Sequence, residues 1–382
     1  MKNLGLSRRS FFAASAALSG GALLATNAVK ANTGDYTSNP LYGPPAGAAK
    51  LNANENPFGP SPAALKAMVE ATQSGAYYVR ESAQKLRDAI AERHGLSRDH
   101  VMLSSGSSGV LTYLALAATQ QGSILAPDLF WDTTALMGAR NSEFGIKRLR
   151  KHPDLAIDLA AMEQALDDDV SLVHITNPNN PTGSALEASS LRAFCAKASS
   201  KAMVLVDEAY NELTDNPAQS TMIPLVKEGK DVAVARTFSK IYGLAGMRVG
   251  YLIAKPELLE EVGQYGLGDY GLNQAGVAGA LASYTDEVFT QYSKKKIVEA
   301  REMVVDALKQ NGLTALPSQT NFMFVDLGKG DADKFRAAME KRNVYIRGIY
   351  RDYTNWSRVS MGKIADVQMY IDAIPEALEE IS

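Results

Sequence analysis

The sequence has a single cysteine, Cys195, and only four histidines among its 382 residues. One cysteine excludes an intrachain disulfide, and together with four scattered histidines it offers no cluster of the ligands that zinc requires. The charges are nearly balanced, with 39 lysines and arginines against 42 aspartates and glutamates and a net charge of −3. A nucleic-acid-binding surface needs a marked basic excess, so that class of function is excluded as well.

The remaining composition is that of an ordinary globular protein. Hydrophobic residues make up 46% of the chain, charged residues 21% and aromatic residues 8%. These values exclude collagen-like and disordered chains, and the length supplies enough apolar material for a large core in two lobes. The chain has no internal repeats or charge runs, and no low-complexity tract after the first thirty residues, which leaves a structural or adhesive role without support.

The first thirty-one residues form a separate segment. A basic start leads to Ser7-Arg8-Arg9-Ser10-Phe11-Phe12, and an apolar stretch of small residues follows from Ala13 to Ala28. This pattern is typical of an export signal, and paired arginines before two phenylalanines are typical of the twin-arginine route. The alternatives are a membrane anchor or a chance arginine pair, but serines and glycines interrupt the apolar stretch and make it a poor membrane span.

We expect cleavage after Ala31, and we expect the mature chain to be periplasmic or otherwise exported by the twin-arginine route. Cleavage leaves 35 basic against 42 acidic residues, a net charge of −7, so the mature chain is expected to be acidic without stable membrane insertion. The twin-arginine route resembles an exporter of folded proteins, which suits a protein that loads a cofactor before it leaves the cytoplasm.

The mature chain alternates short apolar runs with helical patterns. Residues 32–62 are rich in Pro, Gly, Asn and Ala and are expected to form an extended arm. Short β-rich runs follow at residues 101–103, 123–126, 172–176, 203–206, 232–235 and 250–254. Such strands separated by helices predict a largely parallel sheet covered on both faces.

A smaller lobe is expected towards the C-terminus. Residues 286–312 show a long helical pattern, and strands are predicted at 322–327, 344–346 and 357–361. The apolar positions of the helical pattern are Val288, Phe289, Tyr292, Val298, Met303 and Leu308.

Lys240 lies in the segment that carries the largest number of candidate catalytic and binding residues. Thr237-Phe238-Ser239-Lys240 directly follows a predicted strand, and Arg248 comes eight residues later. Open α/β sheets bind ligands at the carboxyl ends of their strands, where a lysine amine can condense with a carbonyl. Arg248 and the two hydroxyls are suited to gripping a phosphate. An exposed loop lysine is the alternative, and for Lys240 alone it is the better one.

Asp207 ends another predicted strand and is followed by Glu208-Ala209-Tyr210. A carboxylate at the end of a buried strand is costly unless it meets a cation, and a protonated pyridine nitrogen is such a partner. A helix N-cap explains an aspartate at this position equally well.

A turn rich in asparagine and proline follows the strand predicted at 172–176. It reads Asn177-Pro178-Asn179-Asn180-Pro181-Thr182-Gly183. Asn180 can offer its amide to a phenolic oxygen or a carboxylate, and a purely structural turn is the alternative.

Two further signals are weaker. Ser107 and Ser108 stand in a glycine-flanked loop before an apolar helix, whose first amides can bind phosphate. Arg358 begins a predicted strand, and its planar guanidinium suits bidentate binding of a carboxylate. A solvated arginine is the commoner case.

Along the chain these segments follow one another as a glycine-serine loop, an Asn-Pro turn, a strand-ending Asp with a Tyr, a Ser-Lys pair with an Arg eight residues on, and a late Arg. In that order they resemble the class I and II, fold-type I aminotransferases, which depend on pyridoxal 5'-phosphate. The segment Leu51–Pro62, which reads LNANENPFGPSP, is similar to the histidinol-phosphate aminotransferase-like branch. The resemblance runs from about Leu51 to the C-terminus and is specific for the superfamily rather than for the substrate.

The resemblance implies an α/β fold with two domains. The large domain, residues 63–285, would be built on a mostly parallel seven-stranded sheet, and the smaller α+β domain would comprise residues 286–382 with the arm. It implies pyridoxal phosphate as cofactor, no metal, an amino donor and a 2-oxo acid as substrates, and a homodimer.

The resemblance also implies roles at the cofactor. Lys240 would bind it covalently and then move a proton at the substrate's α-carbon, and Asp207 would pair with the pyridine nitrogen. Tyr210 and Asn180 would bond the ring's phenolic oxygen. The residues that would hold the phosphate are Ser107, Ser108, Thr237, Ser239 and Arg248.

The remaining roles concern the ring face, the substrate and the partner subunit. Phe130, in preference to Trp131, would stack on the pyridine, and Tyr78 would reach the partner subunit's phosphate. The residues that would bind the substrate are Arg358 at its carboxylate, Arg347 at a distal anion, Asn180 and Asn56.

The sequence departs from the family pattern at three places. The usual Tyr-Pro-acid triplet reads Tyr78-Val79-Arg80, Gly109 replaces a frequent acid, and Thr133 replaces a second aromatic. Histidinol phosphate itself suits an exported protein badly, because histidine synthesis is cytoplasmic, so the substrate stays open.

Two rival functions are left. A decarboxylase or lyase, such as one resembling threonine-phosphate decarboxylase, uses the same cofactor motifs. If the protein were a non-catalytic ligand-binding module, we would expect Lys240, Asp207 or Arg248 to have been lost. All three are present.

Overall fold

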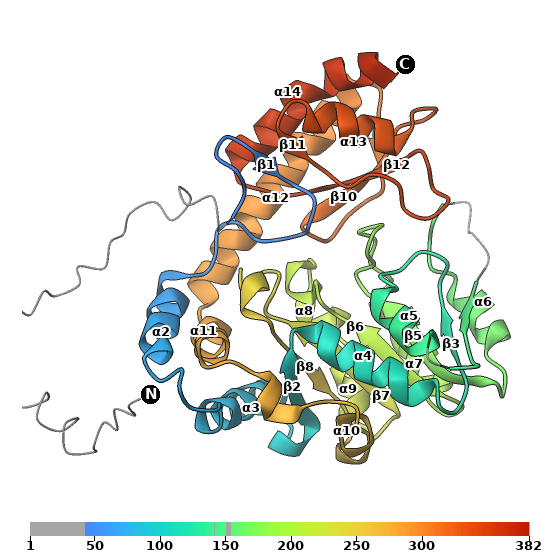
Figure 1. Ribbon diagram of the computed structural model, residues 1–382. Helices are drawn as coiled ribbons and strands as arrows, with labels where there is room; N and C mark the ends of the chain where they lie inside the picture. Colours follow the sequence, from blue (N-terminus) through green and yellow to red (C-terminus); the bar gives the residue numbers. More distant parts are fainter. Residues whose placement is uncertain (1–42, 141, 150–153, 382) are drawn as a thin grey trace, which may run out of the picture. The chain divides into compact units, whose positions relative to one another are not determined.

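The computed structural model describes residues 43–140, 142–149 and 154–381 (Figure 1). The chain divides into two units, Met1–Ala46 and Gly47–Ser382, and the second contains all the helices and strands discussed below. The expected export signal and the first part of the arm lie outside the described residues. Among the described residues, no helix has both the length and the apolar character needed to span a membrane.

A seven-stranded sheet forms the centre of the large lobe, in the order β2-β8-β7-β6-β5-β3-β4. All neighbouring strands are parallel except at β8, which is antiparallel to both β2 and β7. The strands are β2 (Val101–Ser105), β3 (Ser123–Ala126), β4 (Ile146–Arg148), β5 (Val170–Thr176), β6 (Met203–Asp207), β7 (Val232–Thr237) and β8 (Val249–Ile253). The predicted mostly parallel sheet is confirmed. The short edge strand β4, with only one apolar residue, escaped prediction.

Helices cover both faces of this sheet because alternate strand residues point to opposite sides. Leu172 and Leu205 pack in a cluster with α4 and α10, whereas Val173 and Val204 pack in a second cluster with α7 and α9. The helices are α2 (Pro62–Thr72), α3 (Glu81–His94), α4 (Ser107–Ala118), α5 (Thr133–Ala139), α6 (Leu159–Ala165), α7 (Ala188–Ala198), α8 (Pro217–Ser220), α9 (Ile223–Lys227), α10 (Pro256–Gly263) and α11 (Gln274–Tyr284). Short 3-10 turns are η2 (Arg98–His100), η3 (Asn211–Leu213), η4 (Ala245–Met247) and η5 (Gly268–Gly271).

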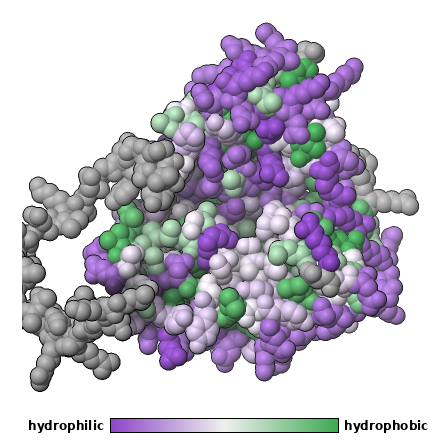
Figure 2. All heavy atoms as spheres, in the orientation of Figure 1, coloured by the Kyte–Doolittle hydropathy of each residue, from purple (hydrophilic) through white to green (hydrophobic). Residues whose placement is uncertain are grey.

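The small lobe combines a three-stranded antiparallel sheet with long helices. The sheet has the order β12-β10-β9, and the short strand β1 pairs in parallel with β11, which brings the arm onto this lobe. The elements are β1 (Ala49–Lys50), α12 (Glu287–Gln310), β9 (Thr314–Ala315), β10 (Phe322–Asp326), α13 (Ala332–Glu340), β11 (Val344–Tyr345), β12 (Trp356–Ser360) and α14 (Ile364–Ile381). On the face shown in Figure 2, hydrophilic side chains dominate this lobe, at the top of the view.

The buried face of helix α12 coincides only in part with its predicted apolar positions, since Phe289 and Leu308 are buried but Val288 and Tyr292 are exposed. Val288 is 82% exposed and Tyr292 is 49% exposed. The buried residues are Phe289, Ser293, Ile297, Ala300, Val304, Ala307 and Leu308. This buried face includes Ser293, whose hydroxyl accepts a hydrogen bond from the Asn56 side chain. A search for hydrophobic residues alone could therefore not locate the buried face.

The carboxyl ends of β5, β6 and β7 lie side by side. Thr176 pairs with Asp207 at the ends of β5 and β6, and Asp207 in turn pairs with Ala235 of β7. This register gathers the residues that follow the three strands at one edge of the sheet.

Candidate active site

A cavity of about 580 Å³ lies at this edge, between residues of the large lobe, the arm and the small lobe. Twelve of the fourteen residues predicted for the site line it, whereas Tyr78 and Asn56 do not. The twelve are Ser107, Ser108, Phe130, Asn180, Asp207, Tyr210, Thr237, Ser239, Lys240, Arg248, Arg347 and Arg358.

Arg248 forms one end of the cavity together with the first residues of α4. Its guanidinium donates to the hydroxyls of Ser108, at 3.0 Å, and Ser239, at 3.4 Å. Thr237 Oγ1 donates to Ser239 Oγ at 3.0 Å. A helix N-terminus, a guanidinium and these hydroxyls together make a cradle for a phosphate.

Backbone geometry keeps this cradle open. Gly106 has a φ of +70°, and a Cβ there would lie 2.1 Å from Arg248 Nη2, so a larger residue would displace the guanidinium. Arg248 itself has a φ of +54°, a left-handed conformation that is uncommon for non-glycine residues.

Asp207 lies deep in the cavity and is 3% exposed. Its Oδ1 accepts a hydrogen bond from the Ala209 N–H at 3.1 Å. Burial raises the pKa of Asp207 to about 7, although this bond and Lys240 oppose the rise. The next turn, η3, has Tyr210 rather than Asp207 at its N-cap, so the helix-cap explanation does not apply. A cation beside Asp207 would favour the charged carboxylate.

Lys240 lines the same cavity as Asp207 and Arg358. Its Nζ donates to the backbone oxygen of Asn54 at 3.2 Å and lies 5.5 Å from the centre of the Tyr210 ring. Burial lowers the pKa of Lys240 to about 8, and the positive charge of Arg358 acts in the same direction. Lys240 therefore holds much more neutral amine near pH 7 than an ordinary lysine, as a nucleophile or a base requires.

Because its pKa is lowered, Lys240 in the cofactor-free protein should react with an amine-labelling reagent at a lower pH than an ordinary lysine does. Acetic anhydride reacts only with the neutral amine, so labelling should rise with pH through a midpoint of about 8. Mass spectrometry of the Lys240 peptide after competitive labelling measures this midpoint. A midpoint near about 10.4, the value of an ordinary lysine, would contradict the electrostatic account.

Arg358 is 6% exposed and is held by neutral partners. Its Nη1 donates to Asn180 Oδ1 and its Nη2 to the backbone oxygen of Asn52, both at 2.9 Å. Burial lowers its pKa. A buried guanidinium with such partners is stabilised by an arriving anion, and a carboxylate matches its planar geometry.

Both aromatic residues considered for the ring face line the cavity. Phe130 packs edge-on against His174, with ring centres 5.0 Å apart, and Arg148 lies 5.0 Å from its ring centre. Trp131 lines the cavity next to it.

Asn56 was predicted to bind the substrate, and this prediction is wrong because Asn56 does not line the cavity. Its side chain is buried and its amide donates to the Ile241 oxygen at 2.6 Å and to Ser293 Oγ at 3.1 Å, while its oxygen accepts from the Phe58 N–H. Asn56 thus holds the loop after Lys240 against α12 and does not line the cavity. The motif in which it was recognised contains three asparagines at alternate positions, and sequence alone did not show which of them faces the site.

Residues missed from the sequence come from the arm and from the loop after β11. Asn52 and Asn54 line the cavity, as do Tyr350 and Arg351, which is paired with Asp128 at 3.1 Å. The asparagine-rich arm motif was the available signal for the first two. Nothing local distinguishes Tyr350 from the other tyrosines of the chain.

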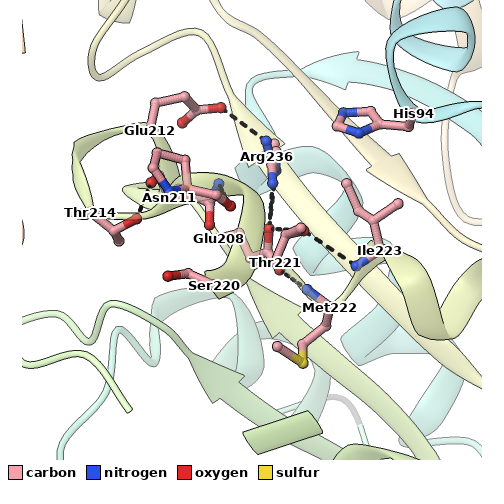
Figure 3. A network of polar contacts seen from close by, with 12 residues as sticks. His94, Glu208, Asn211, Glu212, Thr214, Ser220, Thr221, Met222, Ile223 and Arg236 are labelled. Carbon is pink, nitrogen blue, oxygen red and sulfur yellow. Dashed lines mark hydrogen bonds and ion pairs between the residues drawn. The ribbon is translucent and has the colours of Figure 1, made fainter. Parts of the chain in front are cut away.

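Glu208, Arg236 and Glu212 form a largely buried ion cluster (Figure 3). Glu208 accepts hydrogen bonds from Arg236 Nη2 at 2.7 Å, Thr221 Oγ1 at 2.8 Å and the Met222 N–H at 2.6 Å. Arg236 Nη1 also donates to Glu212, at 3.2 Å. Because Glu208 follows Asp207 and Arg236 precedes Thr237, the cluster ties together two strands that carry site residues.

Replacement of Glu208 by glutamine is expected to destabilise the protein by about 3 kcal/mol, because it leaves the buried Arg236 without its main counter-charge. Denaturant unfolding monitored by fluorescence measures the change. The matched control is Glu212→Gln, whose side chain is 21% exposed and which should cost less. Equal effects of the two variants would contradict the assignment of Glu208 as the principal partner.

The cavity residues fit pyridoxal phosphate, the cofactor that the sequence resemblance implies. The cradle at Arg248 suits its phosphate, Asp207 suits a protonated ring nitrogen, and Lys240 offers an amine to its aldehyde. Three cavity-lining atoms that are buried without a hydrogen-bond partner in the described part of the chain are Thr176 Oγ1, Asn52 Oδ1 and Arg358 Nε. Buried polar atoms are normally paired, so these point to a polar ligand.

Comparison with known proteins agrees with this fit. The sequence model of the family "Aminotransferase class I and II" matches residues 47–374. The chain is 31% identical to a histidinol-phosphate aminotransferase of Halalkalibacterium halodurans, over 87% of this chain and 89% of the relative. It is 34% identical to an aromatic amino acid aminotransferase of Thermobifida fusca, over 80% and 85% of the two chains.

Solved structures show the same fold. A histidinol-phosphate aminotransferase from Sinorhizobium meliloti in complex with pyridoxal-5'-phosphate has a TM-score of 0.80 at 28% identity, over 88% of this chain and 92% of that chain. An L-threonine-O-3-phosphate decarboxylase from Porphyromonas gingivalis has a TM-score of 0.72 at 20% identity, over 87% and 99% of the two chains, and shares the fold alone.

Proposed function

The chain belongs to the class I and class II aminotransferase family as a pyridoxal-phosphate-dependent transaminase, and we propose the roles of its residues from the cavity. The observation that carries this proposal is the convergence of Lys240, Asp207, Arg248 and Arg358 on one cavity. The substrates are an amino acid, or an amine similar to histidinol phosphate, and a 2-oxo acid.

The bound cofactor supplies an electron sink for the charge that is left when the α-proton of the substrate is removed. Lys240 is the base that takes this proton from the α-carbon and returns it, which its lowered pKa favours. Asp207 keeps the proton on the ring nitrogen. Asn180 uses its oxygen for Arg358, which leaves its amide N–H groups for the ring's phenolic oxygen.

Product analysis tests transamination against decarboxylation. A transaminase converts the donor to its 2-oxo acid and needs a 2-oxo acid acceptor for continued turnover. The purified enzyme is therefore expected to form at most one equivalent of 2-oxo acid per active site from the donor alone, and many equivalents only with both substrates present. Release of carbon dioxide in amounts equal to the donor consumed would contradict the proposal and support a decarboxylase.

Replacement of Arg358 by alanine is expected to lower kcat/KM for carboxylate donors by about 100-fold, since a charge-assisted bidentate contact contributes about 3 kcal/mol. Steady-state kinetics measures the loss, and most of it should appear in KM. Arg358→Lys keeps the positive charge but cannot form a planar bidentate contact, so it should restore only part of the affinity for the substrate carboxylate. An unchanged KM in Arg358→Ala would assign the carboxylate to another group.

Arg347 is proposed to bind a second anionic group of the substrate. It lines the cavity beside Tyr350, with its guanidinium carbon 5.5 Å from the ring centre. Arg347→Ala should therefore impair glutamate or histidinol phosphate as donor and leave neutral donors such as leucine unaffected. Equal losses with both kinds of donor would contradict this role.

A homodimer is proposed from an exposed apolar face. Tyr77, Tyr78, Leu267 and Tyr270 are each between 71% and 78% exposed, and Tyr78 packs edge-on against Tyr270. Clustered exposed aromatic residues are typical of interfaces, and this face would let Tyr78 reach the partner subunit's phosphate cradle. Sedimentation equilibrium should give twice the chain mass, and a monomer at micromolar concentration would contradict the proposal.

Export by the twin-arginine route is proposed from the N-terminal sequence. The mature protein isolated from cells should begin at Asn32, and replacement of Arg8 and Arg9 by lysine should retain the chain in the cytoplasm. Recovery of an uncleaved chain from the cytoplasm of wild-type cells would contradict export.

A further inference from the structure

Asn54 contacts both Lys240 and Tyr210. Its backbone oxygen accepts from Lys240 Nζ at 3.2 Å, and its side-chain Nδ2 lies 3.1 Å from the Tyr210 hydroxyl oxygen. Asn54 is 2% exposed and has a φ of +53°, in the left-handed region that favours asparagine and glycine. A buried residue in a left-handed conformation that contacts two site residues is a candidate for a functional role.

Ser360 contacts the oxygen of the Asn54 amide. The Asn54 N–H donates to Ser360 Oγ at 2.9 Å, and Ser360 Oγ donates to Asn54 Oδ1 at 2.7 Å. A hydroxyl has one proton, and here that proton is directed to Oδ1. In this arrangement the amide nitrogen of Asn54 faces the Tyr210 hydroxyl, to which it donates at 3.1 Å.

The Tyr210 hydroxyl is left with one proton to give. Burial raises the pKa of Tyr210 to about 12, so the phenol stays protonated. Its oxygen already accepts from Asn54, and its ring packs edge-on against Phe322, with ring centres 5.2 Å apart. The hydroxyl proton can therefore be donated into the cavity that Tyr210 lines.

We propose that Asn54 is a positioning residue that fixes the Tyr210 hydroxyl as a donor toward the cofactor's phenolic oxygen and holds the Lys240 amine whenever that amine is free. The inference rests on the proposed roles of Lys240 and Tyr210. Because Ser360 belongs to β12 of the small lobe, the same contacts link that lobe to both groups.

The pH midpoint of the visible absorbance of the holoenzyme tests this role. A hydrogen bond donated to the phenolic oxygen lowers the proton affinity of the nearby lysine-derived nitrogen, so Tyr210→Phe should raise the midpoint. Asn54→Gly keeps the left-handed backbone and the carbonyl but removes the amide. It should raise the midpoint by about half a pH unit, the equivalent of one weakened neutral hydrogen bond.

The double variant decides between positioning and a general structural effect. If Asn54 acts through Tyr210, Asn54→Gly should add no further shift in the Tyr210→Phe background. The matched control is Asn343→Gly, at an exposed asparagine with a φ of +58°, which should leave the midpoint unchanged.

Two results would overturn the inference: a wild-type midpoint in Asn54→Gly, or a shift that adds fully to that of Tyr210→Phe. Either is distinct from failure of the proposed function, which would appear as wild-type protein with no visible band from the added cofactor.

Discussion

Replacement of Lys240 by alanine should abolish the visible absorbance of the bound cofactor and lower kcat by about 10⁴-fold. Lys240 lines the cavity, and its Nζ donates to the Asn54 oxygen and lies 5.5 Å from the centre of the Tyr210 ring. The variant removes the amine that binds the aldehyde and the base that moves the α-proton, so both signals should disappear together. Absorbance and steady-state kinetics measure them.

The control for this prediction is a lysine outside the cavity. Lys255 pairs with Asp231 at 2.5 Å, and Lys255→Ala should keep the absorbance and the turnover. Lys240→Ala should also unfold at no lower temperature than the cofactor-free wild type, because a buried amine with a lowered pKa contributes little stability. Retained absorbance in Lys240→Ala would place the covalent attachment on another lysine.

Asp207→Asn should keep the cofactor and lower kcat by about 10²- to 10³-fold, which corresponds to roughly 3–4 kcal/mol of lost stabilisation. Asparagine preserves the size of the side chain and the acceptor for the Ala209 N–H. It does not supply the negative charge that keeps the ring nitrogen protonated. Single-turnover kinetics measure the chemical step, and near-normal turnover would refute the role.

The same variant has a pH signature in the cofactor-free protein. The pKa of Asp207 is raised from 3.8 to about 7 by burial, so ionisation of the native carboxyl opposes folding as pH rises. Asp207→Asn should therefore gain stability relative to wild type between about pH 4 and pH 7, and the gain should level off above pH 7. A difference independent of pH would show that Asp207 is not buried in the cofactor-free protein.

Residues that follow strand ends could be placed from the sequence. Asp207, Asn180 and Lys240 each come shortly after an apolar run, and parallel strands bring their carboxyl ends to one edge. Ser107 and Ser108 could also be assigned to the phosphate cradle, because a loop of glycines and serines before a helix is typical of phosphate binding. Each of these signals left an alternative open by itself, so the placements rested on the order of the segments along the chain and on the family resemblance that this order carries.

Contacts between distant segments could not be predicted in this way. Asn54 and Ser360 are 306 residues apart, and their bonds exist only after the arm packs on the small lobe. Asn54 and Asn56 are the same residue type in one motif, yet the fold directs the first to the cavity and the second to α12. The pairing of Glu208 with Arg236 likewise depends on the order of β6 and β7 in the sheet.

The most direct test of the account is the visible absorbance of the purified protein with pyridoxal phosphate, before and after addition of single L-amino acids and histidinol phosphate. The account predicts a band that requires Lys240, fades with at least one of these donors and returns when a 2-oxo acid is added. A band that no donor changes, or no band at all, would contradict it.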